Sequence, residues 1–297
     1  MALGLGISVY WATQSEPAAA IVSAFKSRVI ADGGTVESPS CAKSDVKFLL
    51  DNPPPSVFDA DYQAILDRST TLGYTAPSAS QQTLQNTLVT DLKTAGVWDK
   101  LDLFYCFATD GDSDYATLNW KSPSSFQVTK VNSPTFTADE GFNGDGASAY
   151  LNTNWNGYWN GVKFIPNDAS AGVWIHTIAT GNAMAYFGDN GTGTDMRQGS
   201  NDFLQGLDAR ASSNTNNSLA YLTNDNSGGV VQIENTTDVA SSSPSFGFLT
   251  SDTMNILAEN GPFVPSDGKV SMFFIGGKIY SEKTDFYNAI SNYISAL

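Results

Sequence analysis

Aromatic and amide side chains are interleaved in one short stretch of this chain, NWNGYWN at 154–160. An aromatic ring can stack on the C–H groups of a sugar, and a neighbouring amide can hydrogen-bond the sugar's hydroxyl groups. The same rings could instead pack the loop against the fold or against another subunit. The pattern predicts a contact surface whose partner, glycan or protein, stays open. The candidate ligand-binding residues are Asn154, Trp155, Asn156, Tyr158 and Trp159.

Two acidic groups have spacings that raise the question of a metal ion. Asp110, Asp112 and Asp114 alternate as in a calcium-binding loop. Tyr115 and Lys121 stand where that loop needs glycine and glutamate, so an EF-hand is excluded. The second group is Asp139, Glu140 and Asp145. To bind a metal ion, its carboxylate oxygens would have to converge on one point, which sequence spacing alone does not establish. We predict acidic turns at both places, with no metal and no cofactor.

Catalytic patterns are weak in this sequence. Glycoside hydrolysis needs two carboxylates at a defined separation, but Glu234 stands alone, and Glu259 and Asp267 flank a proline-containing turn. His176 is the single histidine, and it lies in a strand-like run. A serine hydrolase would carry a G-x-S-x-G motif, which this chain lacks. The GDNGTG run at 188–193 lacks the lysine of a phosphate-binding loop. We therefore predict no catalytic residues and no enzyme activity.

Composition argues against two classes of partner. The 297 residues include 30 Asp and Glu against 15 Lys and Arg, which gives a net charge of −15. Such an acidic surface repels phosphate backbones, so we expect no nucleic acid as a partner. No apolar run approaches the roughly 20 residues that a membrane span needs, so we expect no membrane partner. The N-terminal stretch lacks the cationic start of a secretory signal, which favours folding in a cytoplasm.

The two cysteines are far apart in the sequence. Cys41 and Cys106 form no C-x-x-C pair of the kind that binds metal. Two reduced, buried thiols are the simpler expectation. A disulfide between them stays open.

Helical and strand patterns divide the chain into two parts. Alternating apolar residues at 3–9 predict a strand that could pair with its own sheet or with a neighbouring chain. A helix is expected from Pro17 to Gly33, and another after the triple proline at 53–55, ending before Gly73. The clearest helix is 80–95, with Leu84, Leu88 and Leu92 on one face and Gly96 after its end.

From Leu103 onward the apolar period shortens, and Gly, Asn, Ser and Asp mark frequent turns. Many short strands at this spacing are typical of a sandwich or jelly roll. The chain ends in an expected helix over 282–297. The expected strands are 103–108, 125–130, 134–138, 148–152, 171–179, 183–188, 202–211, 218–223, 229–235, 245–249 and 269–275.

Three parts of the chain together carry a family resemblance. They are GVWDKLDLFYCFATDGDSDYATLNWKSP (96–123), FTADEGFNGDGASAYLNTNW with NDASAGVWIHT (136–155 and 167–177), and KVSMFFIGGKIYSEKTDFYNAISNYISAL (269–297). In order and spacing they resemble a family of tailed-bacteriophage virion proteins whose C-terminal part is a concanavalin A-like, or laminin-G-like, β-sandwich. A fourth part, VIADGGTVESPSC at 29–41, is similar to a segment often found before that domain.

The resemblance implies a mainly β fold, a concanavalin A-like jelly-roll sandwich with a partly helical N-terminal region and a C-terminal helix. It implies residues 1–55 as an attachment region, 56–102 as a helical connector and 103–297 as the sandwich. It also implies a virion protein, assembled in the host cytoplasm, of the head-fibre, capsid-decoration or tail type. Its partners would be other capsid or tail proteins and copies of itself, with a trimer preferred because fibres are commonly symmetric oligomers. A host-surface glycan is the alternative partner, and a polysaccharide-cleaving enzyme is the weaker alternative.

Overall fold

The computed structural model describes residues 58–181, 184–189, 193–198, 202–204, 207–209, 214–242, 247–259 and 263–297. The expected strand at 3–9, the helix from Pro17 and the attachment region 1–55 lie outside these residues, as does Cys41. Phe58–Leu297 is one compact unit. The helices expected in the connector and the strands expected in the sandwich therefore belong to the same unit.

The first of two sheets is antiparallel throughout and contains eight strands among the described residues. Its order is β13-β12-β11-β6-β15-β4-β3, and β1 pairs with β15 beside this path. Two strands share one edge of β15, because β4 pairs with its beginning and β1 with its end. The strands are β1 Leu101–Cys106, β3 Thr135–Thr137, β4 Gly141–Asn143, β6 Ser170–Thr177, β11 Ser218–Asn224, β12 Val230–Glu234, β13 Thr237–Ser241 and β15 Lys269–Gly276.

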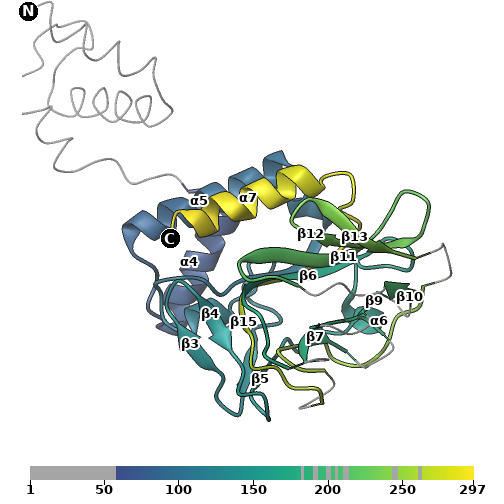
Figure 1. The fold of residues 1–297 in the computed structure, drawn as a ribbon. Helices are drawn as coiled ribbons and strands as arrows, with labels where there is room; N and C mark the ends of the chain where they lie inside the picture. Colours follow the sequence, from purple (N-terminus) through teal and green to yellow (C-terminus); the bar gives the residue numbers. More distant parts are fainter. Residues whose placement is uncertain are drawn as a thin grey trace, which may run out of the picture. The chain divides into compact units, whose positions relative to one another are not determined.

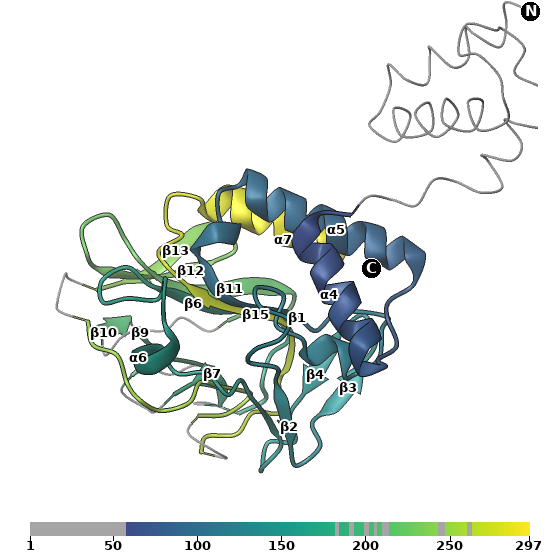
Figure 2. The ribbon, with the colours of Figure 1, turned by 180° about the vertical axis from the view of Figure 1, so that it is seen from behind.

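The second sheet has seven described strands in the order β10-β9-β8-β7-β14-β5-β2, again antiparallel. It packs on the first sheet through a shared core that includes Tyr105, Leu151 and Phe273. Figures 1 and 2 show the two sheets as separate layers. The strands are β2 Thr129–Val131, β5 Tyr150–Asn152, β7 Ala185–Gly188, β8 Asp195–Arg197, β9 Asp202–Leu204, β10 Leu207–Ala209 and β14 Asn255–Ile256.

Both faces of the first sheet are buried at its central strands β6, β11 and β15, which explains their continuous apolar runs. In β15, Phe273 and Ile275 face the second sheet, whereas Met272 and Phe274 face the helices. Successive side chains of a strand point to opposite faces, so a strand buried on both sides needs apolar residues at every position. The sequence SMFFI therefore lacks the alternation of a half-exposed strand. Three helices cover the face of the first sheet that points away from the second sheet, as Figure 1 shows.

The covering helices are α4 Ala60–Leu72, α5 Ala79–Thr94 and α7 Lys283–Ser295. The side chains of Asp59 and Ser78 cap the N-termini of α4 and α5 by accepting backbone N–H groups. Gly73 ends α4 in the left-handed conformation, with a φ of 73°. No helix among the described residues is long and apolar enough to cross a bilayer.

A polar network lies between these helices and the sheet, around the fully buried side chain of Gln85. The Gln85 Oε1 accepts hydrogen bonds from the hydroxyls of Tyr62 (3.0 Å) and Tyr115 (2.7 Å). Its Nε2 donates to the Oγ1 of Thr109 (3.1 Å) and to the hydroxyl of Tyr293 (3.3 Å). One glutamine thus joins α4, α5, α7 and the chain that follows β1.

The predicted fold class, a mainly β sandwich with helices before it and a helix at its end, is confirmed. Cys106 of β1 is a free thiol buried beneath the helices. Burial raises the pKa of this thiol to about 12, so it stays protonated at neutral pH.

Several predicted element boundaries were wrong. The strand expected at 202–211 is divided into β9 and β10, the one expected at 125–130 begins only at Thr129, and the described part of 245–249 contains no strand. Strand β4 was not predicted, because Gly141 suggested a turn. A Cβ on Gly141 would lie 2.1 Å from the carbonyl oxygen of Val270, so this glycine permits a close approach of two strands. Strands β8, β13 and β14 were also not predicted.

Candidate functional site

The predicted contact loop contains a short helix, α6 Gly157–Asn160, which was not predicted from the sequence. The Asn156 side chain caps it by accepting the N–H of Trp159 at 2.8 Å. The Asn160 side chain in turn accepts the N–H of Asn156 at 3.0 Å. Two of the interleaved amides therefore build this turn through their carbonyl oxygens.

Asn154 holds the loop against the edge of the second sheet. Its Nδ2 donates to the carbonyl oxygen of Gln127 (2.8 Å) and to the Oγ1 of Thr129 (3.0 Å). Its φ is 58°, a conformation that asparagine tolerates better than most residues. These contacts give Asn154 a structural role.

Trp155 lies in the core between the sheets, with 1% of its surface exposed. Its ring meets the ring of Phe164 edge to face, with centroids 5.8 Å apart. Its carbonyl oxygen accepts the N–H of Met254 at 2.9 Å. The structure therefore places this candidate residue where its ring cannot stack on a ligand, and only the later aromatic residues of the loop reach the surface.

Tyr158 and Trp159 are exposed side by side. They expose 58% and 71% of their surfaces, and their rings meet edge to face with centroids 4.7 Å apart. Other exposed apolar side chains follow along the same turn and on the adjacent segment 247–250. We call this group the α6 patch, and it comprises Tyr158, Trp159, Val162, Ile165 and Phe248.

Hydrogen bonds hold the chain on both sides of the α6 patch. The carboxylate of Asp102 accepts the N–H groups of Val162 (3.1 Å), Lys163 (2.9 Å) and Phe164 (2.8 Å). The N–H of Tyr158 donates to the carbonyl oxygen of Thr250 at 3.2 Å, which joins α6 to the segment that carries Phe248. The patch thus stands on a turn tied to β1 and to segment 247–250. Asp102 was missed because a lone carboxylate in an apolar strand has no local signature.

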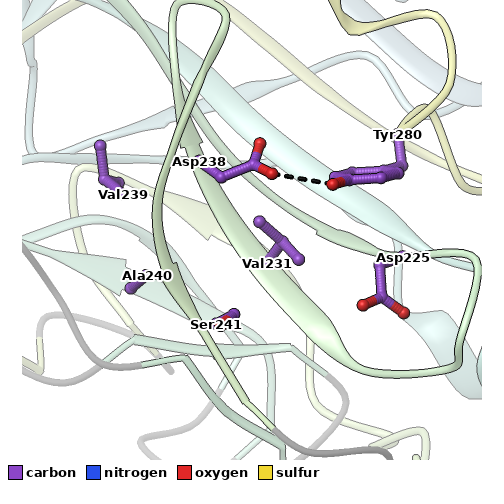
Figure 3. Close-up of a pocket in the computed structure, with 7 residues that line it drawn as sticks. All are labelled: Asp225, Val231, Asp238, Val239, Ala240, Ser241 and Tyr280. Atoms are coloured by element: carbon purple, nitrogen blue, oxygen red, sulfur yellow. Dashed lines mark hydrogen bonds between the residues drawn. The ribbon is translucent and has the colours of Figure 1, made fainter.

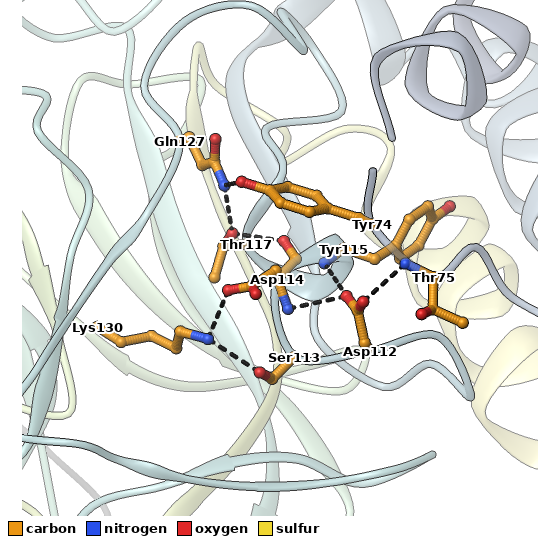
Figure 4. A network of polar contacts seen from close by, with 9 residues as sticks. All are labelled: Tyr74, Thr75, Asp112, Ser113, Asp114, Tyr115, Thr117, Gln127 and Lys130. Carbon is orange, nitrogen blue, oxygen red and sulfur yellow. Dashed lines mark hydrogen bonds and ion pairs between the residues drawn. The ribbon is translucent and has the colours of Figure 1, made fainter. Parts of the chain in front are cut away.

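The first acidic group supports the fold, and each of its carboxylates has different partners. Figure 4 shows the contacts of Asp112 and Asp114. Asp112 accepts the N–H groups of Thr75 and Tyr115, both at 2.7 Å. Burial raises the pKa of Asp112, but these N–H donors outweigh it and the net pKa is lowered. Asp114 forms an ion pair with Lys130 at 2.7 Å. Asp110 accepts the N–H of Ser78 at 3.0 Å.

The second acidic group does not converge either. Asp139 accepts a hydrogen bond from the Nε2 of Gln81 at 2.6 Å, whereas Glu140 forms an ion pair with Lys269. Asp145 accepts backbone N–H groups of its own turn. Within the described residues, no three His, Cys, Asp or Glu side chains are arranged to hold a metal ion.

The turn at Asp145 leads to a pH prediction. Its carboxylate accepts the N–H groups of Ala149, Ser148 and Ala147, which lower its pKa to about 2. A carboxylate whose pKa is lower in the folded state stabilises that state above its ordinary pKa of 3.8. We expect this contribution to be lost as the pH falls from about 4 toward 2. NMR titration of the carboxyl carbon tests this, and a midpoint near 3.8 would contradict it.

The residues considered for catalysis lie in separate structural contacts. Nδ1 of His176 is 3.0 Å from the hydroxyl of Thr177, and burial lowers the pKa of this histidine. Glu234 accepts the N–H of Thr215 at 3.0 Å, and Asp267 accepts that of Thr180 at 2.8 Å. Glu259 is fully buried and paired with Arg197, with 2.7 Å between Oε2 and Nη2.

A pocket of about 330 Å³ lies elsewhere, beside the edge strand β13 (Figure 3). Its two carboxylates already have partners. Asp238 accepts the hydroxyl of Tyr280 at 2.8 Å and pairs with Lys283 at 2.6 Å. Asp225 accepts the N–H groups of Ser227 and Gly229, both at 2.8 Å. None of the predicted contact residues lines this pocket.

Comparison with known proteins gives only distant structural likenesses. No protein-family model matches the chain. No curated protein matches it in sequence. A botulinum neurotoxin serotype D binding domain is similar over 66% of this chain, with 12% identity and a TM-score of 0.43, and the chain spans 52% of that structure.

Two further similar structures are enzymes or parts of enzymes. Domain 4 of AbnA, a GH43 extracellular arabinanase from Geobacillus stearothermophilus in complex with arabinotriose, has 13% identity and a TM-score of 0.34. The match covers 63% of this chain and 98% of that domain. A mutant Trypanosoma rangeli sialidase displaying trans-sialidase activity has 11% identity and a TM-score of 0.43, over 73% of this chain and 40% of that one. Likenesses this distant do not define the function.

Proposed function

We propose that this chain is a non-catalytic binding module that holds a carbohydrate on the α6 patch. The observation that carries the proposal is the exposure of Tyr158 and Trp159 together on a tethered turn. Large exposed aromatic rings cost solvation free energy unless they have a partner, and exposed apolar side chains gathered in one place mark a candidate interaction site. The tethers keep the rings in position before binding, which lowers the entropy lost when a ligand binds.

Polar groups suited to sugar hydroxyls lie beside the rings. The Nδ2 groups of Asn156 and Asn160 donate no hydrogen bond within the described residues, because only their carbonyl oxygens are used in the turn. Both side chains are partly exposed. An amide N–H and an aromatic face together supply the two kinds of contact that a sugar ring offers.

The first test is Trp159→Ala, which removes the most exposed ring of the patch. Loss of a stacked aromatic contact worth about 1.4–2.8 kcal/mol raises the dissociation constant about 10- to 100-fold. We expect that loss for any glycan that the wild-type protein binds on a glycan array, measured by titration calorimetry. Phe263→Ala is the matched control, because Phe263 is 63% exposed but lies outside the α6 patch.

Two results would contradict the carbohydrate proposal. One is an array on which the wild-type protein binds no glycan. The other is a bound glycan whose affinity is the same in Trp159→Ala and in the Phe263→Ala control.

A second candidate is a role in assembly of a tailed-phage virion, where the α6 patch contacts another copy or another capsid or tail protein. Two observations favour it: the sequence resemblance, and the aliphatic members of the patch, Val162 at 73% and Ile165 at 44% exposure. Exposed aliphatic residues suit the apolar centre of a protein interface better than a sugar. Under this candidate, purified phage particles contain the chain by mass spectrometry, and Val162→Ser weakens self-association.

A further inference from the structure

Three lysines near the α6 patch make no ion pair within the described residues. They are Lys121, Lys163 and Lys278, and Lys163 lies on the patch turn itself between Val162 and Ile165. The five other described lysines each pair with a carboxylate at 2.8 Å or less, namely Lys93, Lys100, Lys130, Lys269 and Lys283. In a chain with a net charge of −15, unpaired cations in one region are unexpected.

Backbone contacts bring Lys163 and Lys278 together. A Cβ on Gly277, the residue before Lys278, would lie 3.3 Å from the carbonyl oxygen of Lys163. The N–H of Lys278 donates to Oδ1 of Asp168 at 2.8 Å, on the turn that follows Ile165. The ammonium of Lys121 stands 4.1 Å from the centre of the Trp98 ring. Burial lowers the pKa of Lys121, and the carboxylates of Asp61 and Asp99 partly offset this effect.

The nearby carboxylates do not neutralise these lysines by direct pairing. Asp102 accepts three backbone N–H groups of the patch turn, and Asp168 accepts the N–H of Lys278. Among the described residues, the ion pairs of the lysines are made with other carboxylates than these two. The Lys163 side chain is exposed, lies on the same turn as the patch residues Val162 and Ile165, and has no carboxylate partner among the described residues.

We propose, building on the proposed function, that the ligand is an acidic glycan, one that carries carboxylate or sulfate groups. Its sugar ring would stack on Trp159, and its acidic group would pair with Lys163, with Lys278 as the second cation. Charge-assisted hydrogen bonds of this kind are roughly twice as strong as neutral ones. Carboxylates more than about 8 Å away are screened at physiological ionic strength. The two nearest carboxylates, Asp102 and Asp168, accept backbone N–H groups of Lys163 and Lys278.

The test is an array of matched glycan pairs that differ only in charge: uronates and their methyl esters, and sulfated glycans and their unsulfated forms. We expect the wild-type protein to bind the acidic member of a pair about 5- to 20-fold more tightly, with the difference reduced at 0.5 M salt. Lys163→Gln should weaken binding of the acidic member about 5-fold and leave the neutral member unchanged. Lys130→Gln is the control, because Lys130 pairs with Asp114.

The outcomes separate this inference from the proposed function. Equal binding of both members of each pair, with no effect of Lys163→Gln but a loss in Trp159→Ala, overturns the acidic ligand and leaves the carbohydrate site standing. Acidic selectivity that depends on Lys163 but not on Trp159 overturns the stacking site. Selectivity that is lost in Lys163→Gln, with overall binding lost in Trp159→Ala, supports both.

Discussion

Replacing Gln85 with alanine is expected to lower the free energy of unfolding by about 3–5 kcal/mol. Gln85 is fully buried, and its Oε1 is the acceptor for two buried hydroxyls, those of Tyr62 and Tyr115. Without it both hydroxyls lack this acceptor, and each unsatisfied buried group costs about 1–3 kcal/mol. The substitution also leaves a cavity. A loss of this size is a large part of the roughly 5–15 kcal/mol that stabilises a typical domain.

Thermal or urea unfolding measures the effect, and two further variants test its cause. Thr87 is exposed and lies on α5, the same helix as Gln85. Thr87→Ala should therefore change the free energy of unfolding by less than about 0.5 kcal/mol. Tyr62→Phe removes a single hydrogen bond and should cost about 1 kcal/mol. If Gln85→Ala cost no more than Tyr62→Phe, the network would not be what joins the helices to the sheet.

The helices show how far sequence periodicity reaches. The helix expected at 80–95 is present as α5, and Gly96 follows it with a φ of 70°. The buried face, however, includes Gln81 and Gln85 beside Leu88 and Leu92. A hydropathy pattern treats glutamine as a surface residue. The hydroxyl of Tyr293, which lies 208 residues away in the sequence, reaches the side chain of Gln85 only in the folded protein.

The strands also differ in how well the sequence pattern alone predicts them. Long strands such as β6, β11 and β15 were predicted near their observed positions because each contains a run of apolar residues, rich in β-branched and aromatic types in β6 and β15. The unpredicted strands are five residues or shorter, and their pairing depends on neighbours distant in the sequence. Strand β14 has two residues, held between β5 and β7. A segment this short has no period of its own.

The composition of residues 154–160 marked this loop as a candidate contact surface, but it did not indicate which of its side chains are exposed. Five residues were candidates, and the structure exposes the rings of Tyr158 and Trp159 while it buries Trp155. Nothing in NWNGYWN distinguishes one tryptophan from the other, because burial depends on where Phe164 and Met254 lie. Lys163 was also not singled out, since a lone lysine becomes informative only when its neighbours are known to leave it unpaired.

The two tryptophans therefore provide a matched pair. Trp155→Ala should lower the free energy of unfolding by about 3–5 kcal/mol, because it removes a fully buried aromatic ring from the core between the sheets. Trp159→Ala should change it by less than about 0.5 kcal/mol, because that ring is 71% exposed. Binding should follow the opposite order, with the loss confined to Trp159→Ala wherever Trp155→Ala remains folded.

Because Trp155→Ala could unfold the protein entirely, Trp155→Phe completes the test. Phenylalanine keeps an aromatic ring against Phe164 and should cost about 1–3 kcal/mol, which leaves enough folded protein for titration calorimetry. A folded Trp155→Phe protein should bind glycan as the wild type does. If it lost affinity as strongly as Trp159→Ala, Trp155 would belong to the binding surface after all. Equal losses of stability in both alanine variants would show instead that Trp159 is packed against a part of the protein.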